Sequence, residues 1–281
     1  MTAAALLGAA APRLAAAGID SARLDAEVLL AHALGFGRTA LYARLRDALP
    51  VDACARFEAL LARRERREPV AYLTGVQEFW SLPFGVTPDV LIPRPETELL
   101  VELALQHLPA DAPRTVLDIG TGSACIAVAI ARERPLAHVT AVDISRAALA
   151  VAHRNAVAHG VDARVTFAES DLFDGLAVDA GFDLIVSNPP YLAPNDAVSP
   201  ELASEPRGAL YAGADGLAVI RRLVAAAADR LRPGGRLLIE IGQGQSDAVV
   251  QLARAGGLAD PSVAADLAHI PRVLVAQRAT K

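Results

Sequence analysis

The chain has 281 residues, of which 53% are apolar, and 32 acidic residues against 27 basic ones give a net charge of −5. That apolar fraction can build a core and excludes a disordered chain, while the length predicts two domains, or one large domain with an appendage. Apolar stretches stay far below the ~20 residues of a membrane helix, and the N-terminus lacks the basic start of a secretory signal. Two cysteines, Cys54 and Cys125, are too few for a disulfide framework or a structural zinc site, so we expect no metal.

Residues 1–68 are predicted to be all helical. Ser21 is a suitable N-cap for an amphipathic helix that ends at Gly35, and a second helix covers roughly residues 51–67. The arginine-rich run at 63–67 closes this second helix, where basic side chains suit the helix dipole and we expect a solvated helix end. The alternative is that these arginines contact a partner that carries phosphates.

Residues 69–95 concentrate aromatic and β-forming residues between glycine and proline turns, which predicts a short hairpin that links two domains. The prolines at Pro93 and Pro95 then fix an extended segment, and Pro95 suits the first turn of a helix that runs to about His107. A plain helix start would also explain the glutamates that follow Pro95.

From Thr115 onward, strands and helices alternate, which is the signature of a doubly wound parallel sheet with right-handed crossovers. Alanine-rich helices are predicted between the early strands and near residues 145–159, 217–231 and 245–255. The predicted strands cover residues 115–119, 138–142, 163–168, 182–187, 235–241 and about 271–277.

A glycine-rich turn, Gly120-Thr121-Gly122, follows the first of these strands. Glycines let the backbone turn tightly and approach a ligand beside the positive end of the next helix. The third glycine of a dinucleotide fingerprint is absent, because Cys125 stands in its place, and there is no phosphate-binding lysine. The turn therefore favours a ligand with an adenosine and an amino-acid tail.

Acidic residues follow the next two strands. Asp143 ends the second strand, and its carboxylate suits the vicinal hydroxyls of a ribose. Asp171 follows the third strand, where it can accept from an adenine amino group while Leu172 covers the ring. An aspartate that closes a strand is often only a turn residue, but three such positions at one sheet edge favour a ligand site.

The motif Ser187-Asn188-Pro189-Pro190-Tyr191 directly follows the strand at 182–187. Tandem prolines make a rigid loop without two of its backbone donors, so carbonyl acceptors face outward. Asn188 adds a side-chain acceptor and Tyr191 a flat apolar face. Two acceptors and a ring suit a planar NH2 group, whereas a proline-rich turn alone would not require the asparagine or the aromatic residue.

With this motif on this fold, the chain resembles, over residues 12–278, the HemK/PrmC family of peptide chain release factor N5-glutamine methyltransferases. The helical N-terminal region and the segment Pro93–Glu98 are the specific parts of the resemblance. It implies an α/β class I S-adenosylmethionine-dependent methyltransferase, Rossmann-like, with a mostly parallel seven-stranded sheet. The implied domains are a helical substrate-recognition domain at 1–68, a hairpin linker at 69–95 and a methyltransferase domain at 96–281. Other matching segments are 21–27, 69–75, 79–80, 118–123, 141–145, 205–207 and 212–216.

The resemblance also implies roles for particular residues. The Asn188 oxygen and the Pro189 carbonyl would hold the hydrogens of a glutamine amide, with Asn188, Pro189 and Tyr191 catalytic and Pro190 completing the substrate loop. Two positions depart from the family: Ala124 replaces the usual last glycine of the cofactor loop, and Leu172 stands where an aromatic residue is common. The implied contacts of S-adenosyl-L-methionine, and of its product S-adenosyl-L-homocysteine, are Gly120, Thr121, Gly122, Ser123, Ala124, Asp143, Asp171, Leu172 and Asn188.

The implied substrate is a class 1 peptide chain release factor, methylated on the glutamine of its Gly-Gly-Gln motif, which tunes translation termination. We further expect a cytoplasmic monomer without membrane association or stable nucleic-acid binding. DNA and ribosomal-RNA nitrogen methyltransferases share the Asn-Pro-Pro-aromatic loop. Such enzymes require a basic surface or a target-recognition domain, whereas this chain has an acidic balance and a small helical domain. A non-enzymatic adaptor that binds adenosine compounds would leave Asn188 without a task.

Overall fold

The computed structural model describes residues 1–177 and 181–280, which form two compact units. One unit comprises Met1–Val76 with Val198–Ser204, and the other comprises Gln77–Ala197 with Glu205–Lys281. The helical unit thus extends beyond the predicted boundary at residue 68, because Leu73 is buried in its core.

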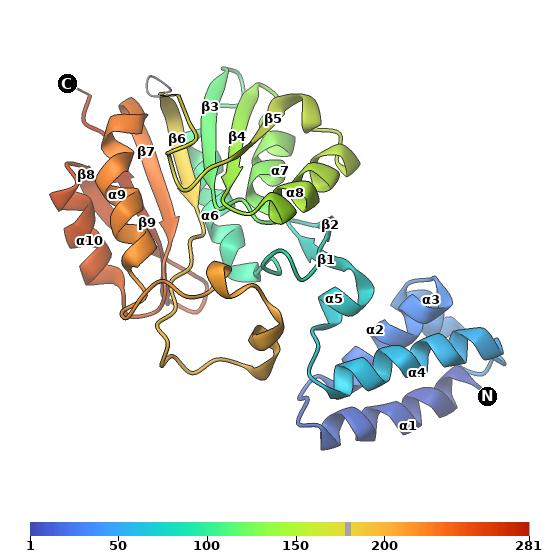
Figure 1. The fold of residues 1–281 in the computed structure, drawn as a ribbon. Coiled ribbons are helices and arrows are strands. Elements are labelled where there is room, and N and C mark those ends of the chain that lie inside the picture. The colour runs from blue at the N-terminus through green and yellow to red at the C-terminus, as the bar shows by residue number, and fades with distance from the viewer. Residues whose placement is uncertain (178–180, 281) are drawn as a thin grey trace. The chain divides into compact units, whose positions relative to one another are not determined.

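The first unit is helical, as predicted (Figure 1). The second predicted helix ends at Glu65, and the first begins after Ser21 and ends at Gly35, although the Ser21 side chain makes no capping hydrogen bond. Apolar side chains from these helices, such as Leu29 and Phe57, form a core of their own. The helices are α1 (Ala3–Ala16), α2 (Ala22–Leu34), α3 (Arg38–Ala43), α4 (Val51–Glu65) and α5 (Val70–Thr74).

The sequence predicted that the arginine-rich end of α4 is solvated, but the structure shows that part of it is buried and paired. Arg64 is only 5% exposed, and its guanidinium pairs with Asp25 at 2.8 Å and with Glu201 at 3.0 Å. Arg67 also pairs with Glu201, at 2.9 Å. Buried arginines need such partners, because an unpaired buried charge is costly. The pairs therefore hold the short 3-10 helix η3 (Pro200–Ser204) to the helical unit.

The second unit contains the seven-stranded sheet, in the order β5-β4-β3-β6-β7-β9-β8. The first five of these strands run parallel, while β9 is antiparallel to both of its neighbours. The fold class is therefore confirmed. The strands are β3 (Arg114–Ile119), β4 (Ala137–Asp143), β5 (Val165–Glu169), β6 (Phe182–Ser187), β7 (Leu231–Glu240), β8 (Ala259–Ala265) and β9 (Pro271–Gln277).

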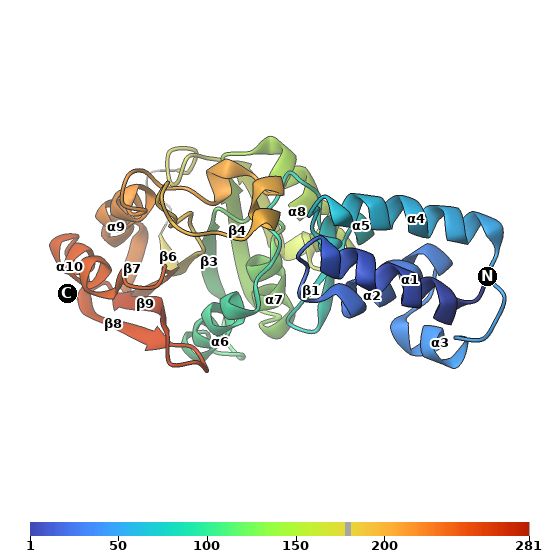
Figure 2. The same cartoon turned by 90° about the horizontal axis from the view of Figure 1, so that it is seen from below.

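Helices cover both faces of the sheet (Figure 1, Figure 2). Alternate residues of a strand serve opposite faces, so Leu184 and Val186 pack on α6, α7 and α8, whereas Ile185 packs on α9 and α10. The helices are α6 (Glu98–His107), α7 (Cys125–Glu133), α8 (Arg146–Ala158), α9 (Ala218–Arg230) and α10 (Ser246–Ala255), with 3-10 helices η1 (Pro95–Thr97), η2 (Asp162–Arg164) and η4 (Arg207–Ala209). No helix in the described ranges is long and apolar enough to cross a membrane.

Strand β8 is the one element of the sheet that the sequence did not predict. Its residues are mostly small or polar and include Pro261, so they lack the β-branched and aromatic signal of a strand. Such a segment is tolerated here because β8 lies at the edge of the sheet and pairs only with β9.

The predicted hairpin consists of β1 (Val76–Phe79) and β2 (Leu82–Gly85). Asn155 of α8 fastens it: Oδ1 accepts from the Gly85 amide at 2.8 Å, and Nδ2 donates to the carbonyls of Gly85 at 2.9 Å and Ser123 at 2.8 Å. Asn155 is 4% exposed, so water cannot replace these bonds. One side chain therefore joins the hairpin to the glycine-rich turn.

We predict that Asn155→Ala lowers the free energy of unfolding by about 2–4 kcal/mol, because each buried polar group left without a partner costs about 1–3 kcal/mol. Urea unfolding followed by the fluorescence of Trp80, the single tryptophan, measures this change. Asn195→Ala is the matched control, since Asn195 is exposed and surface changes stay within about 0.5 kcal/mol. Equal losses in both variants would contradict the prediction.

Candidate active site

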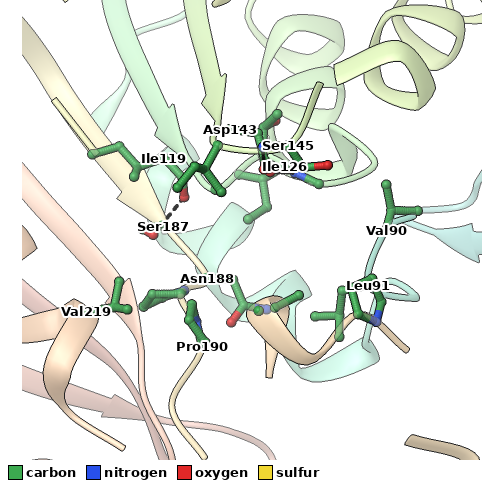
Figure 3. A pocket seen from close by; sticks show the side chains of 18 of the residues that line it. Val90, Leu91, Ile119, Ile126, Asp143, Ser145, Ser187, Asn188, Pro190 and Val219 are labelled. Atoms are coloured by element: carbon green, nitrogen blue, oxygen red, sulfur yellow. Dashed lines mark hydrogen bonds between the residues drawn. The ribbon is translucent and has the colours of Figure 1, made fainter. Parts of the chain in front are cut away.

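A cavity of about 420 Å³ lies in the second unit at the carboxyl ends of β3, β4 and β6 (Figure 3). The strand order reverses here, because β4 lies on one side of β3 and β6 on the other, and open α/β sheets bind ligands at such a point. Of the described residues assigned from the sequence, Ala124 and Tyr191 are not in the lining. Those that line it are Gly120, Thr121, Gly122, Ser123, Asp143, Asp171, Leu172, Asn188, Pro189 and Pro190.

The glycine-rich turn forms one wall of the cavity. Gly120 and Gly122 have φ angles of 70° and 54°, which favour glycine, and a Cβ built on either meets no protein atom within 4 Å. The amides of Gly120 and Thr121 donate to the Val142 carbonyl at 2.8 and 3.0 Å, which ties the turn to β4. Ala124, also at positive φ, is fully buried behind the turn.

Asp143 stands at the end of β4 and faces the cavity (Figure 3). One carboxylate oxygen accepts from the Gly122 amide and the other from the Ser145 amide, each at 2.9 Å. Each oxygen of an ionised carboxylate has two lone pairs, so both can still accept from a diol. Asp143 therefore shapes the glycine turn and also offers acceptors to a ligand.

Asp171 and Leu172 line the side of the cavity that follows β5. The Ser170 hydroxyl donates to the Leu172 carbonyl at 2.8 Å, and Leu172 itself has a φ of 54°. Asp171 pairs with Arg222 of α9 at 2.9 Å. Arg222 also lines the cavity, and no motif in the sequence connects it to Asp171, which is 51 residues away.

Asn188 begins the loop that follows β6. The Ser187 hydroxyl donates to the Ile119 carbonyl at 2.7 Å, which joins the ends of β6 and β3 (Figure 3). The Asn188 amide Nδ2 donates to Thr97 Oγ1 at 3.1 Å. Asn188, Pro189 and Pro190 all line the cavity, so this loop and the glycine turn face the same space.

Tyr191 lies behind the loop. Its side chain packs against the apolar core between the sheet and α9, and its hydroxyl donates to Glu240 at 3.4 Å. Burial raises the pKa of this hydroxyl, and the nearby Glu240 carboxylate raises it further. The Tyr191 carbonyl accepts from Gln245 Nε2 at 3.0 Å, which anchors the end of the loop.

Two carboxylates are buried beneath the site. Burial raises the pKa of Asp118 to about 7, and the Asp143 charge raises it too, although the Thr121 hydroxyl donates to its Oδ2 at 2.6 Å. Asp118 Oδ1 has no hydrogen-bond partner in the described chain. Burial likewise raises the pKa of Glu240 to about 7, opposed by the hydroxyl of Thr97 and the charge of Arg272.

The opposite wall of the cavity comes from the segment before α6. Val90 and Leu91 lie across the cavity from Ser187 (Figure 3). The buried Glu205 side chain accepts from the Ile92 amide at 3.1 Å and pairs with Arg94, which holds this wall in place. The sequence marked the proline-rich segment as a helix start but gave no sign of its pairing with Glu205.

The site fits S-adenosylmethionine. The open space beside Gly120 and Gly122 admits a ligand close to the backbone, and Asp143 retains acceptors for ribose hydroxyls. The turn carries no lysine that would bind phosphates. Within residues 1–177 and 181–280, no cluster of three or more His, Cys, Asp or Glu side chains could hold a metal ion.

Fold and site together define a class I S-adenosylmethionine-dependent methyltransferase. A methyltransferase from Pyrococcus furiosus shares this fold, with a TM-score of 0.54 and 18% identity over 79% of this chain and 98% of that one. A 16S rRNA methyltransferase from T. thermophilus, solved with AdoMet and guanosine, gives a TM-score of 0.53 and 22% identity over 72% of this chain and 49% of that one.

Residues 5–75 match the PrmC N-terminal domain, and residues 97–213 match the methyltransferase small domain. The release factor glutamine methyltransferase of Cereibacter sphaeroides is 51% identical over 99% of this chain and 99% of its own length. That of Burkholderia pseudomallei is 51% identical over 94% of both chains. The chain belongs to the release factor glutamine methyltransferase family, and its cofactor is S-adenosylmethionine.

We predict that Asp143→Ala weakens S-adenosylmethionine binding by about 1.5–3 kcal/mol, because it removes charge-assisted hydrogen bonds to the ribose and the support of the Gly122 amide. Isothermal titration calorimetry measures the affinity. The matched control is Glu169→Ala, at the end of the neighbouring strand β5 and outside the cavity lining among the described residues. Unchanged affinity in a folded Asp143→Ala protein would reject the assignment.

The raised pKa of Asp118 predicts that the stability of the folded protein depends on pH. The unfolded carboxyl ionises near 3.8 and the folded one near 7, so its contribution to stability is present below about pH 4 and is lost as the pH rises to about 7. Relative to Asp118→Asn, the wild type should therefore lose stability between pH 5 and pH 8. Urea unfolding at both pH values measures the difference, and parallel pH dependence in the two proteins would contradict the prediction.

Proposed function

We propose that this chain transfers a methyl group from S-adenosylmethionine to the side-chain amide nitrogen of the glutamine in the Gly-Gly-Gln motif of a class 1 peptide chain release factor. The observation that carries the proposal is the loop after β6, whose Asn188, Pro189 and Pro190 face the cavity that the glycine turn also lines. Its relatives in Cereibacter sphaeroides and Burkholderia pseudomallei carry the name release factor glutamine methyltransferase, which supports the proposal.

The loop suits an amide NH2 group. The Asn188 oxygen and the Pro189 carbonyl accept its two hydrogens, and both prolines lack the backbone N–H that would compete with it. A glutamine nitrogen is a weak nucleophile because its lone pair is delocalised into the carbonyl. Holding both hydrogens aims that nitrogen, and such positioning supplies a large part of the acceleration.

Gly120, Thr121, Gly122, Ser123, Asp143, Asp171 and Leu172 are the cavity-lining residues that would hold the cofactor. S-adenosylmethionine supplies a sulfonium-bound methyl group, which is electrophilic. Positive charge develops on the amide nitrogen during transfer, and the preorganised acceptors Asn188 Oδ1 and Pro189 O stabilise it. The nitrogen needs no base beforehand, because its proton leaves after the charge has formed.

Recognition of a whole release factor needs more surface than a loop that holds one side chain. We assign this role to the helical unit, which has its own core and supplies no residue to the described cavity lining. The net charge of −5 suits a protein substrate better than a nucleic acid. We propose that the enzyme acts in the cytoplasm as a monomer and does not bind nucleic acid stably.

We predict that Asn188→Ala lowers the single-turnover rate of release factor methylation by about 10²–10³-fold, since one preorganised polar contact is worth that much. Mass spectrometry of the Gly-Gly-Gln peptide follows the reaction. Affinity for S-adenosylmethionine should change much less. Asn195→Ala, an exposed asparagine seven residues further along, is the matched control.

A near-normal rate for Asn188→Ala would show that the amide clamp is wrong and that the proline loop is only structural. Parallel reactions with duplex DNA and ribosomal RNA test the alternative substrate class. Methylation of either nucleic acid in place of the release factor would overturn the proposed function.

A further inference from the structure

A chain of hydrogen bonds links Asn188 to a buried carboxylate at the end of β7. Asn188 Nδ2 donates to Thr97 Oγ1 at 3.1 Å, and the Thr97 hydroxyl donates to Glu240 Oε2 at 2.7 Å. Thr97 and Glu240 are each 1% exposed. Water therefore does not compete for either group, and the direction of each bond is decided by the side chains alone.

The number of available protons sets the direction of these two hydrogen bonds. A threonine hydroxyl has one proton, and Glu240 only accepts when it is ionised, which its pKa of about 7 places above neutral pH. Because the Thr97 proton is used on Glu240, Thr97 Oγ1 can only accept from Asn188. The amide of Asn188 must then turn its NH2 group to Thr97, which leaves Oδ1 for the cavity.

The opposite direction would disable the substrate loop. If Thr97 donated to Asn188 Oδ1, the NH2 group of Asn188 would face the cavity in its place. The NH2 group of Asn188 would then face the NH2 group of the substrate glutamine, and both are donors. The Pro189 carbonyl would be the one acceptor left for the glutamine in this loop.

We propose that Thr97 and Glu240 are positioning residues that fix the Asn188 amide with its oxygen toward the substrate nitrogen, an inference that rests on the proposed function. Neither group needs to touch the glutamine. The substrate loop is held from its other end as well, because Tyr191 donates to the second oxygen of Glu240 at 3.4 Å. One carboxylate thus accepts from hydroxyls on both sides of the loop.

The first test compares Thr97→Val, which keeps the shape but removes the hydroxyl, with Thr97→Ser, which keeps the hydroxyl. Single-turnover methylation of a purified release factor by the full chain should fall about 10- to 100-fold in Thr97→Val, the scale on which misplacing a reacting group acts. Thr97→Ser should restore most of the rate. Thr166→Val, an exposed threonine of β5, should leave it unchanged.

The second test separates positioning from a structural role. In an Asn188→Ala background there is no amide to orient, so adding Thr97→Val should lower the rate no further. Losses that multiply, or a Thr97→Val rate equal to the wild-type rate, would overturn the inference. Adding Thr97→Val should leave the S-adenosylmethionine affinity of each background unchanged, and a loss of affinity equal to the loss of rate would also overturn the inference.

If the Thr97→Val variant does not fold, Glu240→Gln provides the same comparison. A glutamine can present either its oxygen or its NH2 group to Thr97, so the direction of the two hydrogen bonds is no longer enforced. The methylation rate should therefore fall. In the Asn188→Ala background, Glu240→Gln should lower the rate no further. Wild-type activity separates the two claims. A wild-type chain that does not methylate a release factor contradicts the proposed function, whereas an active wild type with an equally active Glu240→Gln variant contradicts the positioning role.

Discussion

The adjacency of β3 and β6 is the constraint on which the rest of the site depends. Ile119 and Ser187 are register partners at the carboxyl ends of these strands, and the Ser187 hydroxyl donates to the Ile119 carbonyl. The glycine turn leaves the sheet directly after one strand and the Asn188 loop directly after the other. The strand order reverses between β3 and β6, which brings the glycine turn and the Asn188 loop to one cavity.

Hydrogen bonds to carboxylates hold the polar groups around this cavity in place. Three carboxylates around the cavity accept hydrogen bonds from other elements: Asp143 from the Gly122 amide, Glu205 from the Ile92 amide and Glu240 from the Thr97 hydroxyl. Buried carboxylates cost free energy unless they are hydrogen-bonded, and the raised pKa values of Asp118 and Glu240 reflect that cost. Asp118 accepts from Thr121 and Glu240 accepts from Thr97, and both threonines line the cavity.

Local sequence predicted most of the elements, and the glycine turn it assigned to the cofactor lines the cavity. Gly120, Asp143 and Asn188 each follow a strand that the apolar pattern identifies, and position after a strand determines which edge of the sheet a residue occupies. Strand β8 was missed because an edge strand can form from small residues and a proline. Whether Ala124 and Tyr191, both outside the described lining, contact ligands stays a prediction.

Pairings between distant residues could not be predicted in this way. Thr97 and Glu240 are 143 residues apart in the sequence, and Arg94 and Glu205 are 111 apart. A charged or hydroxyl side chain carries no local signal of its partner, because the pairing arises only when the sheet and its loops have assembled. The sequence therefore predicted Asn188 as the group that meets the substrate, and the structure shows the hydrogen bonds that link Asn188 to Thr97 and Thr97 to Glu240.

A crystal structure of the enzyme with S-adenosylhomocysteine and a release factor would test the central claim most directly. The account predicts that the glutamine amide nitrogen lies within hydrogen-bond distance of Asn188 Oδ1 and the Pro189 carbonyl, with Asn188 Nδ2 still on Thr97. A glutamine bound through its carbonyl to Asn188 Nδ2, or bound away from the loop after β6, would contradict it.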